Sequence, residues 1–235
     1  MADQGRLVVV SNRTPPVDPT SPEAGRRDFP VGGLVSALRS SLDDHGGIWF
    51  GWSGRAREPG SPAEPTTARI GAIQLVAMDL ARNDVNLFYN VFSNRTLWPL
   101  LHSFPAKMTI RHDAYRAYLR VNRNYAVTIA PMLSEGDLVW VHDYHLMSLG
   151  HELRLLGWQG RVGYFLHTPF PPAEVFTLLP WADELMEMLM DFDLVGVQTR
   201  RYEHNLVDAL SGELNGYLIG DRFLSDGRSI RTKAY

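Results

Sequence analysis

The chain has 235 residues, with 23 lysines and arginines against 26 aspartates and glutamates and a formal net charge of −3. Apolar residues make up 45% of the sequence and charged residues 21%, proportions that exclude disordered, collagen-like and fibrous chains. The sequence has no cysteine, which excludes a disulfide framework, a thiolate nucleophile and any cysteine-based zinc site. The slightly acidic balance disfavours nucleic-acid binding, because neutralising phosphates requires a basic surface.

Hydrophobic runs in the sequence are short. The LVVV run at 7–10 is among the longest, far below the roughly 20 apolar residues that span a bilayer. The single Arg6 ahead of this run does not make a secretory signal. We therefore expect a soluble, cytoplasmic protein of one domain or a little more, with no membrane partner.

The first half of the chain predicts strands joined by long polar connections. Short β-branched runs that end in polar turns are typical of buried parallel strands, whereas apolar residues at three- and four-residue steps predict helices. In chain order we expect a strand over 6–12, a polar loop over 14–30, a helix over 31–47, strands over 48–54 and 70–79 with a surface loop over 55–69 between them, short helices over 84–101, and one long amphipathic helix over 109–133.

The second half alternates strands and helices more clearly. We expect strands over 137–143, 161–168 and 193–199, helices over 145–157, 172–191 (broken at Pro180) and 200–214, and short strand-like pieces over 215–235. Continuous apolar strands that alternate with helices predict an α/β fold, in which helices cover both faces of a parallel sheet.

Polar side chains gather where these strands end. In open α/β sheets, ligands bind beyond the carboxyl ends of the strands. The residues at those ends are Ser11, Asn12 and Arg13; His142, Asp143, Tyr144 and His145; His167 and Thr168; and Gln198, Thr199, Arg200 and Arg201. A purely structural sheet does not need this concentration, so the pattern predicts a ligand site at that edge.

Arg13 and the pair Gly32 and Gly33 suit an anion, but these three residues also have structural interpretations. Arg13, between a strand and two prolines, can fork onto phosphate or carboxylate, or it is an exposed loop arginine. Gly32 and Gly33 at a helix start let backbone N–H groups approach a phosphate or sugar, or they form a tight turn. The dinucleotide fingerprint, the P-loop and the nucleophile elbow are all missing from the sequence, which disfavours dinucleotide enzymes, P-loop kinases and serine hydrolases.

The remaining candidates suit a hydroxyl-rich ligand. Asp143 at a strand end can bind sugar hydroxyls, and the His-x-x-His spacing around it lacks a third ligand, so we expect no metal. His167, beside a stiff proline-rich turn, is either a structural histidine or one that faces a ligand. Tyr89 and Trp98 have flat apolar faces with polar tips, which suit either a sugar ring or an ordinary core.

Several segments together resemble the family of trehalose-6-phosphate synthases, which are retaining glycosyltransferases with two Rossmann-like domains facing a cleft. The matching segments include VVVSNR, WFGWSG, FYNVFSNRTLWP, VWVHDYHLM and GYFLHTPFPPAEVF in that order, and the likeness runs from about residue 6 to the end. It implies that 1–235 form the Rossmann-like, acceptor-binding N-terminal domain of a two-domain GT-B enzyme. The family's C-terminal domain, which binds the nucleotide sugar, has no counterpart in the sequence, so we expect a piece of a longer protein or a naturally short relative.

The resemblance also implies an acceptor site. Arg13 and Tyr89 match the residues that bind the acceptor phosphate, and Trp98 matches a residue that shapes the acceptor pocket. Asp143 matches the carboxylate that binds the acceptor sugar at the catalytic centre.

A donor site is implied in the same way. His167 matches the histidine near the anomeric carbon, which also belongs to the catalytic centre, and Gly33 matches the glycine whose N–H approaches the donor diphosphate, with Gly32 supporting that turn. No metal or other cofactor is implied.

We therefore expect an enzyme that transfers glucose from UDP-, GDP- or ADP-glucose to glucose-6-phosphate, giving trehalose-6-phosphate and a nucleoside diphosphate. The nearest alternative is a relative that uses another acceptor, such as glycerol-3-phosphate or a cyclitol phosphate. An alternative from a different class is a non-catalytic domain that binds sugar phosphates. The donor base and the oligomeric state, a homo-oligomer included, stay open.

Overall fold

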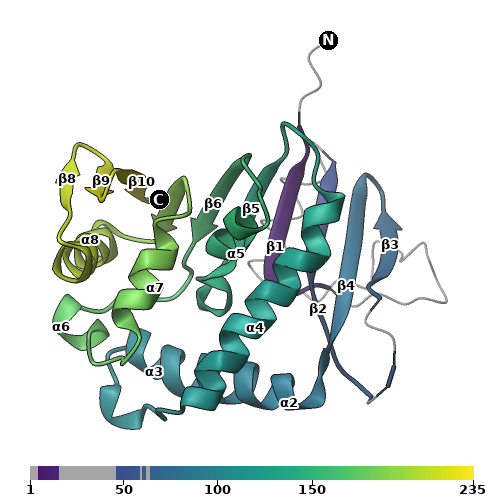
Figure 1. Ribbon diagram of the computed structural model, residues 1–235, viewed down its shortest axis with the longest axis horizontal. Coiled ribbons are helices and arrows are strands. Elements are labelled where there is room, and N and C mark those ends of the chain that lie inside the picture. Colours follow the sequence, from purple (N-terminus) through teal and green to yellow (C-terminus); the bar gives the residue numbers. More distant parts are fainter. Residues whose placement is uncertain (1–4, 16–45, 59, 62–63) are drawn as a thin grey trace.

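A computed structural model describes residues 5–15, 46–58, 60–61 and 64–235 (Figure 1). The strands of this part of the chain are β1 (Leu7–Arg13), β2 (Gly47–Arg57), β3 (Thr66–Ile70), β4 (Ile73–Ala81), β5 (Leu138–His142), β6 (Arg161–Phe165), β7 (Leu194–Val197), β8 (Tyr217–Ile219), β9 (Arg222–Ser225) and β10 (Arg228–Ala234). They form one sheet in the order β3-β4-β2-β1-β5-β6-β7-β10-β9-β8.

The centre of this sheet is parallel and its two edges are antiparallel. β4, β2, β1, β5, β6, β7 and β10 pair in parallel with their neighbours. β3 adds antiparallel to β4 at one edge, and β9 and β8 add antiparallel beyond β10 at the other. The continuous apolar runs expected for parallel strands are therefore confirmed in β1, β2, β5, β6 and β7.

The helical segments connect the parallel strands. They are α2 (Arg82–Asp84), the π-helical η1 (Val85–Leu97), α3 (Trp98–Leu101), α4 (His112–Ile129), α5 (Leu149–Leu155), α6 (Ala173–Phe176), α7 (Ala182–Leu189) and α8 (Arg200–Leu214), with short 3-10 turns η2 (Pro105–Lys107), η3 (Ala130–Met132) and η4 (Tyr144–Leu146). The run of α2, η1 and α3 passes along the lower edge of the molecule in Figure 1, beneath the parallel strands.

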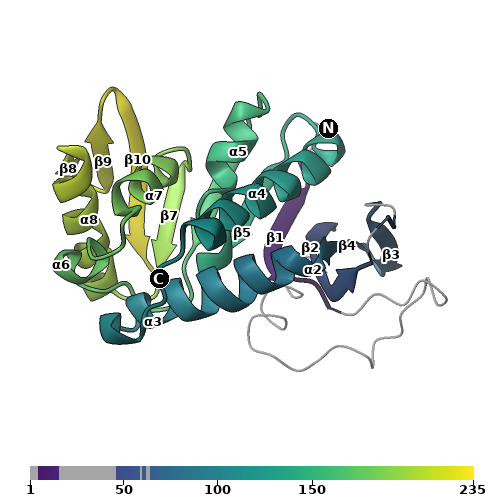
Figure 2. The same cartoon turned by 60° about the horizontal axis from the view of Figure 1, so that its bottom comes forward.

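Alternate residues of each strand face two different cores. Val8, Val10 and their counterparts in the other parallel strands share one large buried cluster with the residues of α4, α5, α7 and α8. Val9 and Trp49 belong to a smaller cluster of strand residues on the opposite face. The described helices thus pack on one face (Figure 2), and the helix expected over 31–47 lies outside the described residues.

Two expectations for the region before α4 were wrong. The predicted loop over 55–69 holds the end of β2 and all of β3 except Ile70. Alternation along β3 buries Ala68 and Ile70 before Gly71 turns the chain at a φ of 59°. The short helices expected over 84–101 are one continuous run, most of it π-helical. A π-helix bonds i to i+5, so its sequence shows no 3.6-residue apolar period.

The helix expected over 145–157 was also wrong at its start. Residues Tyr144–Leu146 form a 3-10 turn, and α5 begins only at Leu149. Side chains of α4 donate hydrogen bonds to the carbonyl oxygens of Tyr144 and His145. These carbonyl oxygens therefore have partners outside α5 and do not need the N–H groups of a helical turn. The helix therefore begins after this turn rather than within it.

Candidate functional site

Asp143 follows β5 directly and has a strained backbone. Its φ is 73° and its ψ 165°, a region that costs a residue with a side chain about 1–3 kcal/mol. Its N–H donates to the Phe165 carbonyl oxygen at 2.8 Å, and its Oδ1 accepts from the N–H of His167 at 3.4 Å. Burial raises the pKa of its carboxyl to about 6. Backbone strain and a partly desolvated carboxylate thus coincide at one strand end.

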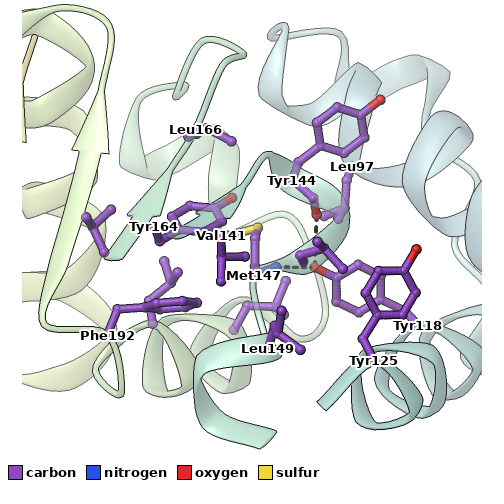
Figure 3. Close-up of a cluster of buried hydrophobic side chains, with 14 of the residues drawn as sticks. Leu97, Tyr118, Tyr125, Val141, Tyr144, Met147, Leu149, Tyr164, Leu166 and Phe192 are labelled. Carbon is purple, nitrogen blue, oxygen red and sulfur yellow. Dashed lines mark hydrogen bonds between the residues drawn. The ribbon is translucent and has the colours of Figure 1, made fainter. Parts of the chain in front are cut away.

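The turn after Asp143 is clamped by α4 (Figure 3). The Tyr118 hydroxyl donates to the Tyr144 carbonyl oxygen at 2.9 Å and accepts from the N–H of Met147 at 2.9 Å. Asn122 donates from its side-chain amide to the His145 carbonyl oxygen at 3.1 Å. These bonds hold the peptide groups that would otherwise be buried without partners, and they fix the segment that carries Asp143.

His167 lies one strand away, at the end of β6. Its Nε2 is 2.9 Å from Nδ1 of His142, and the two rings stack with centroids 5.2 Å apart. Burial lowers the pKa of both imidazoles, that of His142 to about 3. Asp143 and His167 lie next to each other because β5 and β6 are parallel neighbours in the sheet.

Arg13 presents a cation at the end of β1. It pairs in register with Trp52 on β2, and its guanidinium carbon lies 5.0 Å from the Trp52 ring centroid. Gly54, at a φ of 89°, makes room for this group, since a Cβ there would lie 1.8 Å from an Arg13 guanidinium nitrogen. A guanidinium stacked on an aromatic face keeps its N–H fork available for an anion.

A row of rings joins Arg13 to the Asp143 turn. Tyr89 of η1 meets Trp52 edge to face, with centroids 5.3 Å apart, and stacks on His145 at 5.8 Å. His145 stacks in turn on Tyr144 at 4.0 Å, and the Tyr144 hydroxyl donates to Asn94 at 3.0 Å. The ends of β1 and β5, the middle of β2 and η1 are therefore joined by one row of packed, largely buried rings.

Trp98, the first residue of α3, packs against His102. The two rings stack with centroids 4.1 Å apart, and 43% of Trp98 is exposed. His102 is also near enough to Asp143 to affect the pKa of its carboxyl electrostatically, as the smallest of the effects on that pKa. Trp98 therefore lies in the neighbourhood of Asp143, with His102 as its own stacking partner.

The structure brings most of the predicted site residues together. The Asp143 carboxylate accepts a hydrogen bond from the backbone N–H of His167. Arg13 and Tyr89 both pack against the ring of Trp52. The predicted donor-site residues Gly32 and Gly33 lie outside the described residues. Sequence reasoning placed His142, Tyr144 and His145 at a strand end without giving them a role, and it missed Trp52. Only the packing of the folded chain reveals the contacts of these four residues.

A cavity of about 900 Å³ opens on the sheet face opposite α4. It begins at His142 and His167 and runs over Gly163 and Gly196 toward Arg161 at the start of β6. In the described part of the chain, no group of three or more His, Cys, Asp and Glu residues could hold a metal. No helix among the described residues is long and apolar enough to cross a membrane.

Comparison with known proteins decides the family. The family model of glycosyltransferase family 20 matches residues 5–235. The chain belongs to glycosyltransferase family 20. It is also 40% identical over 206 residues to the trehalose-6-phosphate synthase of Escherichia coli (strain K12), which covers 88% of this chain and 42% of that relative.

Two solved structures of relatives show the same fold. Trehalose-6-phosphate synthase from E. coli bound with UDP-2-fluoro glucose matches 98% of this chain with a TM-score of 0.88 and 37% identity. An α,α-trehalose-phosphate synthase (UDP-forming) from Burkholderia xenovorans in complex with glucose-6-phosphate matches 98% with a TM-score of 0.87 and 36% identity. The matches cover 48% and 49% of those chains, so this chain spans about half the length of its relatives.

Proposed function

We propose that this chain is the acceptor-binding N-terminal domain, over 1–235, of a retaining glycosyltransferase. The reaction is transfer of glucose from a nucleotide-glucose to glucose-6-phosphate, giving trehalose-6-phosphate and a nucleoside diphosphate. The observation that supports it best is the row of packed rings that runs from Trp52, on which the Arg13 guanidinium stacks, through Tyr89 to His145, two residues after Asp143. It lies in a chain whose family relatives bear that activity in their names.

The acceptor phosphate is proposed to lie at Arg13. A guanidinium can hold a phosphate by two charge-assisted hydrogen bonds, and its stacking on Trp52 limits the conformations it must give up on binding. Tyr89 packs against the same ring and is proposed as the second phosphate-binding residue.

The acceptor sugar is proposed to lie between Asp143 and Trp98. A carboxylate accepts hydrogen bonds from sugar hydroxyls, and an exposed indole offers a flat apolar face. With a pKa near 6, the Asp143 carboxyl is ionised at neutral pH and can accept such bonds. The protein then contributes mainly by positioning the reacting groups and stabilising developing charge.

The donor is proposed to meet His167 and the glycines Gly32 and Gly33. The E. coli relative is described with a UDP-glucose analogue, and we propose UDP-glucose ahead of GDP- and ADP-glucose. The glycine assignment is supported by the motif match alone.

Calorimetric titration of the chain tests the acceptor assignment. We expect glucose-6-phosphate to bind, glucose to bind far more weakly, and Arg13→Ala to weaken glucose-6-phosphate binding by more than about tenfold, since each charge-assisted bond contributes roughly 1.5–3 kcal/mol. Exposed Arg82→Ala, an arginine whose partner is Glu58 at the surface, is the matched control.

The same titration distinguishes the alternatives. If glycerol-3-phosphate or a cyclitol phosphate binds more tightly than glucose-6-phosphate, that compound takes the place of glucose-6-phosphate as the proposed acceptor. Binding of glucose-6-phosphate without any glucose transfer by the protein expressed from its whole gene would favour a non-catalytic sugar-phosphate-binding domain. Equal weakening of glucose and glucose-6-phosphate by Arg13→Ala would show that Arg13 supports the fold instead of the phosphate.

A further inference from the structure

Within the described residues, the imidazole of His167 makes one side-chain hydrogen bond, and its partner is His142. His142 is the last residue of β5 and is 1% exposed. The bond joins its Nδ1 to Nε2 of His167 at 2.9 Å. His142 pairs in register with Phe165, the last residue of β6, and His167 follows two residues later. The position of this bond is therefore set by the sheet itself.

Both rings are held in place by aromatic neighbours. Trp140, two residues earlier on β5, lies against His142 with centroids 4.4 Å apart, and Phe165 on β6 lies against His167 at 4.7 Å. The two imidazoles also stack on each other at an interplanar angle of 23°. Each ring therefore has little freedom to turn away from the shared bond.

The shared bond holds a single hydrogen at neutral pH. Burial lowers the pKa of both histidines, so both rings are neutral and each carries one N–H. If His142 donates, His167 carries its hydrogen on Nδ1. If His142 accepts, His167 carries its hydrogen on Nε2, and its Nδ1 is an acceptor. The tautomers of the two residues are therefore coupled.

The second nitrogen of His142 decides between these arrangements. His142 Nε2 is buried and has no hydrogen-bond partner among the described residues. If His142 accepted, this nitrogen would be an orphaned N–H donor, whereas if His142 donates, it is an orphaned acceptor. Among buried backbone groups, N–H donors without partners are rarer than carbonyl acceptors without partners, and the same preference favours the arrangement in which His142 donates.

We propose that His142 is a positioning residue that fixes the tautomer of His167: His142 Nδ1–H donates to His167 Nε2, and His167 therefore presents Nδ1–H as a hydrogen-bond donor. His167 is partly exposed, so this N–H is available to a ligand. Its ligand, which rests on the proposed function, is an oxygen of the donor sugar or diphosphate. A neutral N–H donor suits such an oxygen, whereas an unprotonated nitrogen suits only a hydroxyl that donates.

Nitrogen NMR of the chain labelled with ¹⁵N-histidine tests the tautomer directly, without any substrate. We expect His167 to show a protonated Nδ1 and an unprotonated Nε2. In His142→Phe, which keeps a flat ring but no donor, we expect these two resonances to exchange positions toward the Nε2–H form favoured by free imidazole. His142→Asn, whose side-chain amide can donate from a similar place, should retain the Nδ1–H form.

The wild-type spectrum alone can overturn the proposal, whether or not the variants fold. A protonated Nε2 on wild-type His167 contradicts it, and so does a His167 spectrum that is the same in wild type and His142→Phe. His204, whose side chain is 76% exposed, serves as the internal reference and should not change in any variant. Absence of glucose-6-phosphate binding would overturn the proposed function but leave the tautomer result intact.

Discussion

At the scale of single residues, Asp143 brings two unfavourable features to the folded protein. Its φ of 73° with ψ of 165° is a conformation that glycine adopts freely and other residues do not. Its carboxyl is also desolvated enough to raise its pKa. Strain and burial of this kind gather at functional sites, and each can be measured by its own substitution.

Asp143→Gly should be more stable than Asp143→Ala. Both variants lack the carboxylate, so the difference between their free energies of unfolding reports the backbone strain. The greater flexibility of glycine in the unfolded chain makes this difference smaller than the strain itself. We expect the glycine variant to be more stable by about 1–2 kcal/mol, measured by urea unfolding of both variants. An alanine variant that equals or exceeds the glycine variant would show that the backbone is not strained.

Asp143→Asn should raise the melting temperature above pH 6 but not near pH 4. The pKa of the folded carboxyl, about 6, exceeds its ordinary value of 3.8, so the folded state binds more protons, and wild-type stability falls as pH rises through this interval. Asparagine carries no charge, so the melting temperature of the variant should exceed that of wild type by an amount that grows from pH 4 to pH 6 and then levels off. Thermal melts at several pH values measure it, and a constant difference would contradict a buried carboxylate.

At the scale of elements, α4 acts as the support of the Asp143 turn. Tyr118 accepts from and donates to two backbone groups of that turn, and its ring is fully buried. Figure 3 shows both bonds leaving the Tyr118 hydroxyl toward Tyr144 and Met147. The helix therefore contributes both apolar surface and the hydrogen bonds that shape the site.

Tyr118→Phe should destabilise the protein by about 2 kcal/mol or more, because two buried backbone groups lose their partner at roughly 1–3 kcal/mol each. Glucose-6-phosphate binding should weaken as well, since the turn carries Asp143. Tyr217→Phe, at a position 60% exposed, is the control and should change neither. Unaltered unfolding of Tyr118→Phe would mean that water replaces the lost hydroxyl.

The elements also show what the sequence reveals and what it conceals. The strands over 6–12, 137–143, 161–168 and 193–199 were predicted because parallel strands buried on both faces are continuous apolar runs. β3 was missed because its sequence, TTARI, has only a small alanine and one isoleucine as buried apolar residues and follows a polar loop. η1 was missed as one element because a π-helix does not have the apolar period of an α-helix.

The candidate site was likewise predictable only in part. The closeness of Asp143 and His167 could be predicted because each follows an apolar strand, and a right-handed crossover sets such strands side by side. The bond between His142 and His167 depends on the register of β5 against β6, and the contact of Arg13 with Trp52 depends on that of β1 against β2. Register is a property of the folded sheet, so these partners are not visible in the sequence.

At the scale of the whole molecule, the described residues contain a substantial core. The large cluster unites the parallel strands with α4, α5, α7 and α8, and many of its members are fully buried. We therefore predict that a polypeptide of these 235 residues folds and retains the proposed acceptor site, because Arg13, Trp52, Tyr89 and Asp143 all lie on this sheet or on elements packed against it.

Transfer of glucose by that polypeptide is a different matter. It corresponds to 42% of the E. coli relative's length, and a reaction between two bound sugars requires groups that hold the donor diphosphate as well as the acceptor. Loss of a single group that stabilises developing charge typically lowers turnover by about 10²–10³. The family resemblance implies that further donor-binding groups lie in the remaining length of the relatives, and their loss should lower turnover further, because the two substrates are then no longer held in reacting geometry.

We therefore predict that the 235-residue polypeptide binds glucose-6-phosphate but releases nucleoside diphosphate at least ~10³-fold more slowly than the E. coli relative. A coupled assay of nucleoside diphosphate release, run on both proteins with UDP-, GDP- and ADP-glucose, measures this directly. Asp143→Asn in the polypeptide should leave its residual rate near background. Turnover close to that of the relative would mean that the described strand ends hold the donor as well as the acceptor, and would place the whole reaction within this sheet.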